Sequence, residues 1–75
     1  MPLTWAERQA IGHAIRQARH AKGVRQRDLA EKVGARAEFV GWVERGYRAY
    51  TNDERNEKLI KAMVDVLGLT LDGLL

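Results

Sequence analysis

Cysteine is absent from this sequence of 75 residues. Neither a disulfide framework nor a thiolate zinc site can therefore form, a composition that suits the reducing cytosol. The N-terminus also lacks an apolar run long enough for a signal peptide, and no stretch approaches the roughly 20 apolar residues that span a bilayer. These absences predict a soluble protein of the cytoplasm.

The length of the chain and its charge distribution narrow the possible functions. The length supports one domain, residues 1–75, and a domain of this size buries only about 60% of its unfolded surface. The net charge of +3 hides an asymmetry: residues 1–50 hold ten Lys and Arg against five Asp and Glu, whereas residues 51–75 hold three against five. A basic region facing a polyanion is the distribution of a nucleic-acid binder, and ordinary surface charge is the alternative.

Helical spacing dominates the chain, and no segment shows the sustained alternation of a strand. Thr4 and Glu7 have the spacing of a capping box, which predicts a helix start near Trp5. Apolar residues then recur at helical intervals in four stretches, which end near Gly23, Gly34, Gly46 and Gly68. Thr70 is placed to cap a final short turn. We expect an all-α fold, a bundle of four to five helices.

The second and third predicted helices have helix-turn-helix spacing over about residues 26–46. Small Ala30 allows two helices to cross closely, and Gly34 makes the turn. Val40 and Val43 anchor the following helix from behind. Such a unit projects its second helix, here about residues 36–45, at an angle that lets it enter the major groove of DNA.

On these residues the chain resembles the lambda-repressor-like, or Xre-type, helix-turn-helix regulators. The resemblance extends from about Ile11 to Leu75 and is carried by the motifs IGHAIRQAR, GVRQRDLAEKVG, VERG and LGLTLDGLL. It implies a five-helix bundle that binds operator DNA, usually as a dimer, with the third helix in the major groove.

The resemblance also implies roles for three polar residues. Gln26, at the start of the second helix, matches the glutamine that commonly contacts the DNA backbone and braces the recognition helix; a solvated helix start is the alternative. Arg19 and Glu44 match a pair that often forms a salt bridge between the first and third helices. A buried pair of this kind is structural, because losing either partner strands a charge at a cost of about 3–5 kcal/mol.

Departures from the family pattern lie beside the helix-turn-helix. Arg25 and Arg36 stand where Ser or Thr normally caps the second and third helices. Each helix is therefore expected to lose about 1 kcal/mol of capping and to gain a cation near a phosphate. The loop between Gly46 and Leu59 is longer than in the family pattern.

The outward face of the third helix is expected to read bases. When Val40 and Val43 of this helix face inward, a helical wheel places four residues on the face that reads bases in the family: Ala37, Glu38, Gly41 and Trp42. Glu38 would accept a hydrogen bond from the amine of cytosine, while Ala37 and Trp42 would contact thymine methyl groups. Gly41 would let the helix backbone approach a base edge closely. Packing of Trp42 on a neighbouring element or a protein partner is the alternative.

Cations surround that face of the predicted recognition helix. These cations and the glutamine at the start of the second helix are predicted to contact DNA phosphates. The predicted phosphate ligands are Arg25, Gln26, Arg27, Arg36, Arg45 and Arg48. A solvated charged surface is the alternative. Each real contact steepens the fall of DNA affinity with salt by nearly one unit of log-log slope.

Catalysis is not expected. His13 and His20 stand seven residues apart without a carboxylate or third ligand at matching spacing, and no glycine-rich phosphate loop follows a strand. We therefore expect no enzyme activity, metal, cofactor or small-molecule effector. The rival function is a protein-interaction module, such as an antitoxin or co-regulator domain that grips a protein through the Trp42 face.

Dimerisation is expected through the C-terminal helices, residues 52–75. These helices present more apolar surface than one small bundle easily buries, and exposed patches of this kind usually mark contacts. The residues concerned are Leu59, Val66, Leu69, Leu71, Leu74 and Leu75. Two-fold pairing spaces the recognition helices one DNA turn, about 34 Å, apart and calls for a palindromic operator.

The sequence as a whole predicts a homodimeric regulator of transcription that binds double-stranded DNA and associates with the nucleoid. A repressor or autoregulator is favoured over an activator, because no second domain for an effector is present.

Overall fold

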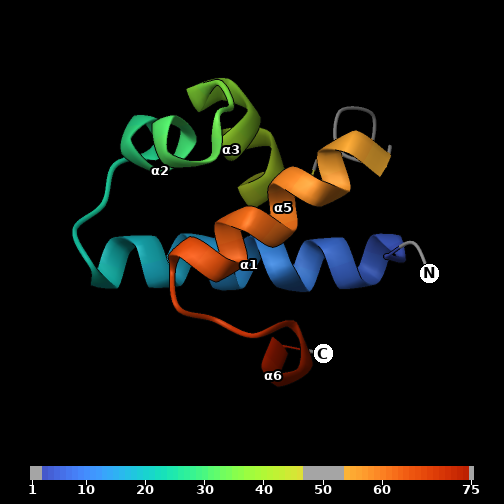
Figure 1. Ribbon diagram of the computed structural model, residues 1–75. Helices are drawn as coiled ribbons and strands as arrows, with labels where there is room; N and C mark the ends of the chain where they lie inside the picture. The colour runs from blue at the N-terminus through green and yellow to red at the C-terminus, as the bar shows by residue number, and fades with distance from the viewer. Residues whose placement is uncertain (1–2, 47–53, 75) are drawn as a thin grey trace.

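In a computed structural model, which describes residues 3–46 and 54–74, every regular element of these ranges is an α-helix (Figure 1). The helices are α1 (Trp5–Ala21), α2 (Gln26–Val33), α3 (Ala37–Arg45), α5 (Glu54–Val66) and α6 (Leu71–Leu74). The predicted all-α bundle is thus confirmed. No described helix combines the length and apolar content that crossing a lipid bilayer requires.

The long helix α1 separates two groups of shorter helices (Figure 1). On one side, α2 and α3 pack against each other, α3 packs on α1, and α5 contacts both α1 and α2. On the other side, α6 returns to contact α1. The helix-turn-helix and the C-terminal turn therefore lie on opposite sides of the molecule.

The first helix begins where the capping box predicts. Thr4 Oγ1 accepts from the amide of Glu7 at 3.1 Å, and Glu7 Oε1 accepts from the amide of Thr4 at 2.8 Å. At the other ends, α2 stops at Gly34 with φ 75° and α3 stops at Gly46 with φ 73°. Glycine adopts this left-handed conformation without the steric penalty of a β-carbon. Local capping signals thus define the helix-turn-helix.

The core lies where α1, α2, α3 and α5 meet. Its buried apolar residues are Ile11, Ile15, Leu29, Ala30, Phe39, Val40, Val43, Ile60, Met63, Val64 and Leu67. Full burial of one such large side chain contributes about 1.5–3 kcal/mol. The valines of α3 belong to this core, so α3 is anchored from behind as expected.

A close approach of two backbones sets the crossing of α1 and α3. A β-carbon added at buried Gly12 would stand 2.1 Å from the carbonyl oxygen of Val43. That distance is far below van der Waals contact, so only glycine fits at this crossing. The sequence interpretation assigned no role to Gly12.

A buried ion pair outside the predicted set joins α1 to α5. Arg8 Nη2 lies 3.5 Å from Glu57 Oε1, and the two side chains are only 5% and 10% exposed. The amide of Leu3 donates to the same carboxylate oxygen. Arg8 lies one turn before Ile11 on the same helix face, so its position in the apolar stripe is the signal that would have predicted burial.

Candidate nucleic-acid interface

The first turn of α3 lies on the surface of the helix-turn-helix. The turn between the helices closes with the amide of Ala35 donating to the carbonyl of Ala30 at 2.9 Å. Arg36 then serves as the N-cap of α3 without a side-chain capping bond. Arg36, Ala37 and Glu38 are all exposed. This end of α3 is therefore available to a groove.

The expected orientation of Gly41 is wrong. Gly41 is buried, and a β-carbon added there would lie 3.6 Å from Gln26 Nε2. The helical wheel assumed a helix covered on one side, but both α1 and α2 pack against α3. Gly41 therefore faces the side chain of Gln26 on α2 and not the predicted base-reading surface.

Trp42 also differs from its expected outward position. It is half-buried and packs against the core cluster. Its side chain lines a hollow shared with Arg36 and Phe39, and with Asn56 and Leu59 of α5. Part of the Trp42 side chain is therefore buried by packing on neighbouring elements, which was the alternative to base contact.

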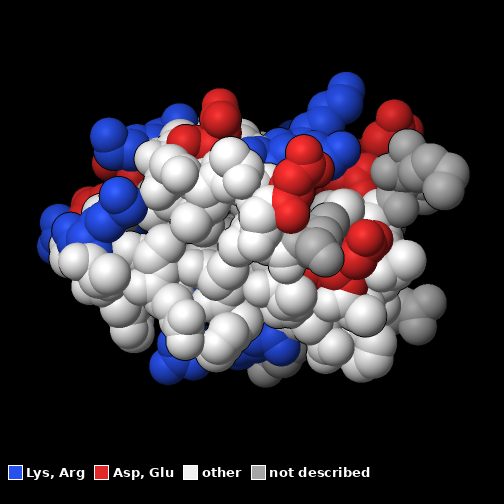
Figure 2. All heavy atoms as spheres, turned by 90° about the horizontal axis from the view of Figure 1, so that it is seen from below, with Lys and Arg blue, Asp and Glu red and all other residues white. Residues whose placement is uncertain are grey.

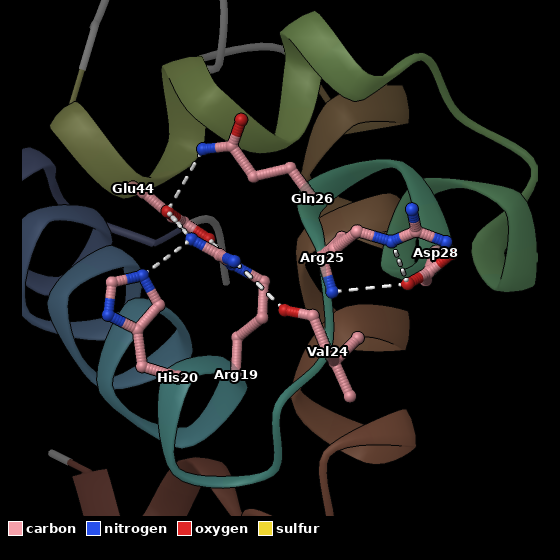
Figure 3. A network of polar contacts seen from close by, with 7 residues as sticks. All are labelled: Arg19, His20, Val24, Arg25, Gln26, Asp28 and Glu44. Carbon is pink, nitrogen blue, oxygen red and sulfur yellow. Dashed lines mark hydrogen bonds and ion pairs between the residues drawn. The ribbon is translucent and has the colours of Figure 1, made fainter.

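A polar network links α1, α2 and α3 behind the exposed turn (Figure 3). Arg19 Nε donates to Glu44 Oε2 at 2.7 Å and Arg19 Nη2 to Glu44 Oε1 at 3.0 Å. Gln26 Nε2 donates to the same Glu44 Oε1 at 3.2 Å, and Arg19 Nη1 to the carbonyl of Val24 at 2.9 Å. The network brings together the three polar residues that the resemblance singled out.

Burial makes this network structurally important. The side chains of Arg19 and Glu44 are 9% and 3% exposed. Among the described residues, every buried side-chain nitrogen or oxygen has a hydrogen-bond partner. Because an unpaired buried charge is costly, each member holds the others in place. The side chain of Gln26 on α2 is thereby held against α3, with one of its amide hydrogens directed to Glu44.

The missing serine or threonine cap of α2 is replaced in part by Asp28. Asp28 Oδ2 accepts from the amide of Arg25 at 3.2 Å and from Arg25 Nε at 3.0 Å (Figure 3). The side-chain hydrogen bond from Arg25, supported by its backbone hydrogen bond, lowers the pKa of Asp28. The same hydrogen bond raises the pKa of Arg25. A carboxylate thus accompanies this predicted phosphate ligand.

The other predicted phosphate ligands occupy different surroundings. Arg27, Arg36 and Arg45 are exposed, on α2, at the start of α3 and at its end. Arg48 lies outside the described residues. Three exposed guanidinium groups therefore border the helix-turn-helix on both of its helices.

The residues expected at a dimer interface are largely packed within the chain itself. Half-buried and in contact with the core are Leu59, Leu69, Leu71 and Leu74. Val66 is 45% exposed, and Leu75 lies outside the described residues. The side of the molecule that carries α6 presents a broad area with few charged side chains (Figure 2). Less apolar surface therefore remains for a partner than the sequence predicts. Among the described residues of the predicted interface, Val66 is the exposed one.

The geometry on α2 and α3 agrees with a comparison to known protein families. A family model described as a helix-turn-helix domain matches residues 10–74. The chain belongs to the helix-turn-helix domain family. Membership indicates DNA binding, since such domains place their second helix in the major groove. Neither curated proteins nor solved structures provide a match for this helix-turn-helix domain.

Proposed function

We propose that this protein is a sequence-specific regulator of transcription that binds double-stranded DNA with α3 in the major groove. The observation that carries the proposal is the exposed first turn of α3, bordered by exposed arginines on both helices of the motif. A polyanion is attracted to such a border, and the major groove is wide enough for one helix. Lambda-repressor-like or Xre-type regulators are the branch of the family that the sequence motifs favour.

Two side chains of the first turn carry the proposed base contacts. Glu38 accepts a hydrogen bond from the amine of a cytosine, and Ala37 contacts a thymine methyl group. Trp42 contributes through the part of its side chain that is exposed, while Gly41 faces Gln26 and makes no proposed base contact. A carboxylate near phosphates weakens non-specific binding, so Glu38 favours selectivity over affinity.

Phosphate contacts position the helix in the groove. Arg27, Arg36 and Arg45 supply cations around α3, and Gln26 supplies an amide at the start of α2. Arg25 joins them with its charge partly balanced by Asp28. Arg48 completes the proposed set. These contacts orient the domain and carry the salt dependence of binding.

A homodimer on a palindromic operator fits the small size of the domain. A single short recognition turn reads few base pairs, and two copies double the site. The proposed contact surface is the side that carries α6, which has few charged side chains (Figure 2), together with Val66, which is 45% exposed. Occupying an operator blocks transcription without further machinery, so repression or autoregulation is the proposed effect.

Selection from a random duplex library, followed by fluorescence titration at low and high salt, tests this function. The expected outcome is an enriched palindromic site bound tightly at low salt, with affinity falling steeply as salt increases. A random duplex serves as the control and should bind more weakly at every salt concentration. Absence of binding to either duplex at low salt contradicts the proposal.

The rival is a protein-interaction module that uses the hollow beside Trp42. The large apolar residues that line this hollow are Phe39, Trp42 and Leu59, and its charged lining residues are Arg36 and Arg55. This combination fits an acidic segment with one large apolar anchor. Failure of DNA binding, together with capture of such a peptide, would favour this function.

A further inference from the structure

A polar cavity lies between α1, α2 and α3, behind the proposed DNA-binding turn. Its volume is about 130 Å³, which leaves room for several water molecules or one tetrahedral anion. The lining residues are Arg16, Arg19, His20, Gln26, Gly41, Glu44 and Arg45. Figure 3 shows four of them, with Glu44 lying between the side chains of Arg19 and Gln26.

The charges that line the cavity favour an anion. Three arginines face it against a single carboxylate. That carboxylate, Glu44, already accepts hydrogen bonds from both Arg19 and Gln26. The remaining lining charges, those of Arg16 and Arg45, are cationic. An oxyanion entering this space meets donors from α1 and α3 and no uncommitted carboxylate.

The contact between Arg19 and His20 places one ring nitrogen of the imidazole against a guanidinium group. His20 Nε2 lies 3.0 Å from Arg19 Nη2 (Figure 3). A guanidinium only donates, so a hydrogen bond at this contact requires the lone pair of His20 Nε2 as the acceptor. A protonated ring has no acceptor at this nitrogen and must turn away from Arg19. His20 is exposed.

We propose that this cavity binds a phosphate group, held by Arg16, His20 and Arg45, and that His20 takes up a proton when the group binds. The charged groups around His20 are Arg16 and Arg19 on α1, and Glu44 and Arg45 on α3. A bound phosphate brings negative charge and hydrogen-bond acceptors beside the imidazole. Where the phosphate comes from the DNA backbone, the inference rests on the proposed function.

The first experiment measures the pH dependence of DNA affinity. Histidine ordinarily changes charge between about pH 5 and pH 8, and the uptake of one proton makes affinity increase by up to tenfold per pH unit as pH falls. We expect a several-fold increase from pH 8 to pH 6 for the intact chain, as this range of titration implies. His20→Gln should abolish the increase. His13→Gln, an exposed histidine outside the cavity, should preserve it.

A second pair of variants tests the cation. Arg16→Gln should lower DNA affinity several-fold more than Lys61→Gln, which removes an exposed cation from α5. Equal effects of these two variants, together with an unchanged pH dependence in His20→Gln, would overturn the inference and leave the proposed DNA binding intact.

Titration with inorganic phosphate at fixed pH separates the two sources of the group. The ring protons of His20 should shift in nuclear magnetic resonance spectra, with His13 as the internal reference. A response to DNA alone assigns the site to the backbone phosphate, and a response to inorganic phosphate alone assigns it to the free anion. If DNA is not bound, the proposed function fails, and an unshifted His20 in phosphate then overturns the inference separately.

Discussion

Gly12 of α1 lies directly against the backbone carbonyl of Val43 in α3, where an added β-carbon would stand 2.1 Å from the oxygen. A main-chain carbonyl inside a helix cannot rotate away as a flexible side chain can. The two helices therefore contact each other through their backbones at this crossing. Gly41 lies in the same helix as Val43, yet a β-carbon added there would meet only a side chain, at 3.6 Å.

Alanine substitutions at these two glycines should have opposite effects. Gly12→Ala should lower the free energy of unfolding by about 1–3 kcal/mol or more, because overpacking forces the helices apart. Gly41→Ala should be neutral or stabilise by up to about 1 kcal/mol, since alanine favours a helix and meets only an ordinary contact. Thermal and urea unfolding measure both. Equal destabilisation by the two variants would contradict a backbone contact between Gly12 and Val43.

Glu44→Gln should destabilise the protein by about 3 kcal/mol, because it leaves the guanidinium of Arg19 buried without its counter-charge. Urea unfolding followed by circular dichroism measures the loss. Glu31→Gln, an exposed carboxylate on α2, is the matched control and should change stability by less than about 0.5 kcal/mol. Combining Glu44→Leu with Arg19→Met should recover much of the stability, because apolar residues replace the ion pair.

Arg36→Gln should weaken binding to all DNA sequences alike. The loss of one phosphate contact lowers the magnitude of the log-log salt slope by about 0.9. Fluorescence anisotropy at several salt concentrations, with the selected and a random duplex, measures the slope. Lys58→Gln on α5 controls for net charge and should leave the slope nearly unchanged. An unaltered slope in Arg36→Gln would remove this residue from the interface.

The Arg25 and Asp28 pair should titrate in acid. Its hydrogen bonds lower the pKa of Asp28 below the ordinary value of 3.8. A lowered folded pKa means that the pair stabilises the protein above about pH 3.8 and that this contribution is lost as pH falls through the lowered value. Arg25→Gln should return the pKa toward 3.8, and Arg27→Gln should change it less, because Arg27 acts only through its charge. Carboxyl titration by nuclear magnetic resonance distinguishes the two variants.

Val66→Lys should weaken self-association at least tenfold without unfolding the monomer, since this side chain is 45% exposed. A charge placed in an apolar contact loses hydration on pairing, and tenfold corresponds to about 1.4 kcal/mol. Sedimentation of the intact chain and of the variant, with and without operator DNA, measures the effect. Identical association of the two proteins would move the dimer contact elsewhere.

Local signals explain why much of the fold was predictable. The capping box of Thr4 and Glu7 and the left-handed glycines 34 and 46 act within one turn of the helix they define. Their residue types therefore indicate helix boundaries without knowledge of the packing. The apolar stripes likewise predicted the core, because their spacing matches one face of a helix.

Packing between helices explains the residues that were misplaced or missed. A helical wheel divides a helix into one inner and one outer face, but α3 is covered by α1 and α2 on different sides, which buries Gly41. The roles of Gly12 and of the Arg8 and Glu57 pair depend on which helix lies opposite. Helix spacing in one sequence contains no information about that neighbour.

The backbone contact between Gly12 and Val43 has a consequence for engineering new binding preferences. The orientation of α3 depends on main-chain atoms and buried valines, whereas Ala37 and Glu38 support no part of the core. Randomising these two positions should therefore alter which operator is chosen while the scaffold remains folded. Folding and recognition occupy separable positions of one nine-residue helix.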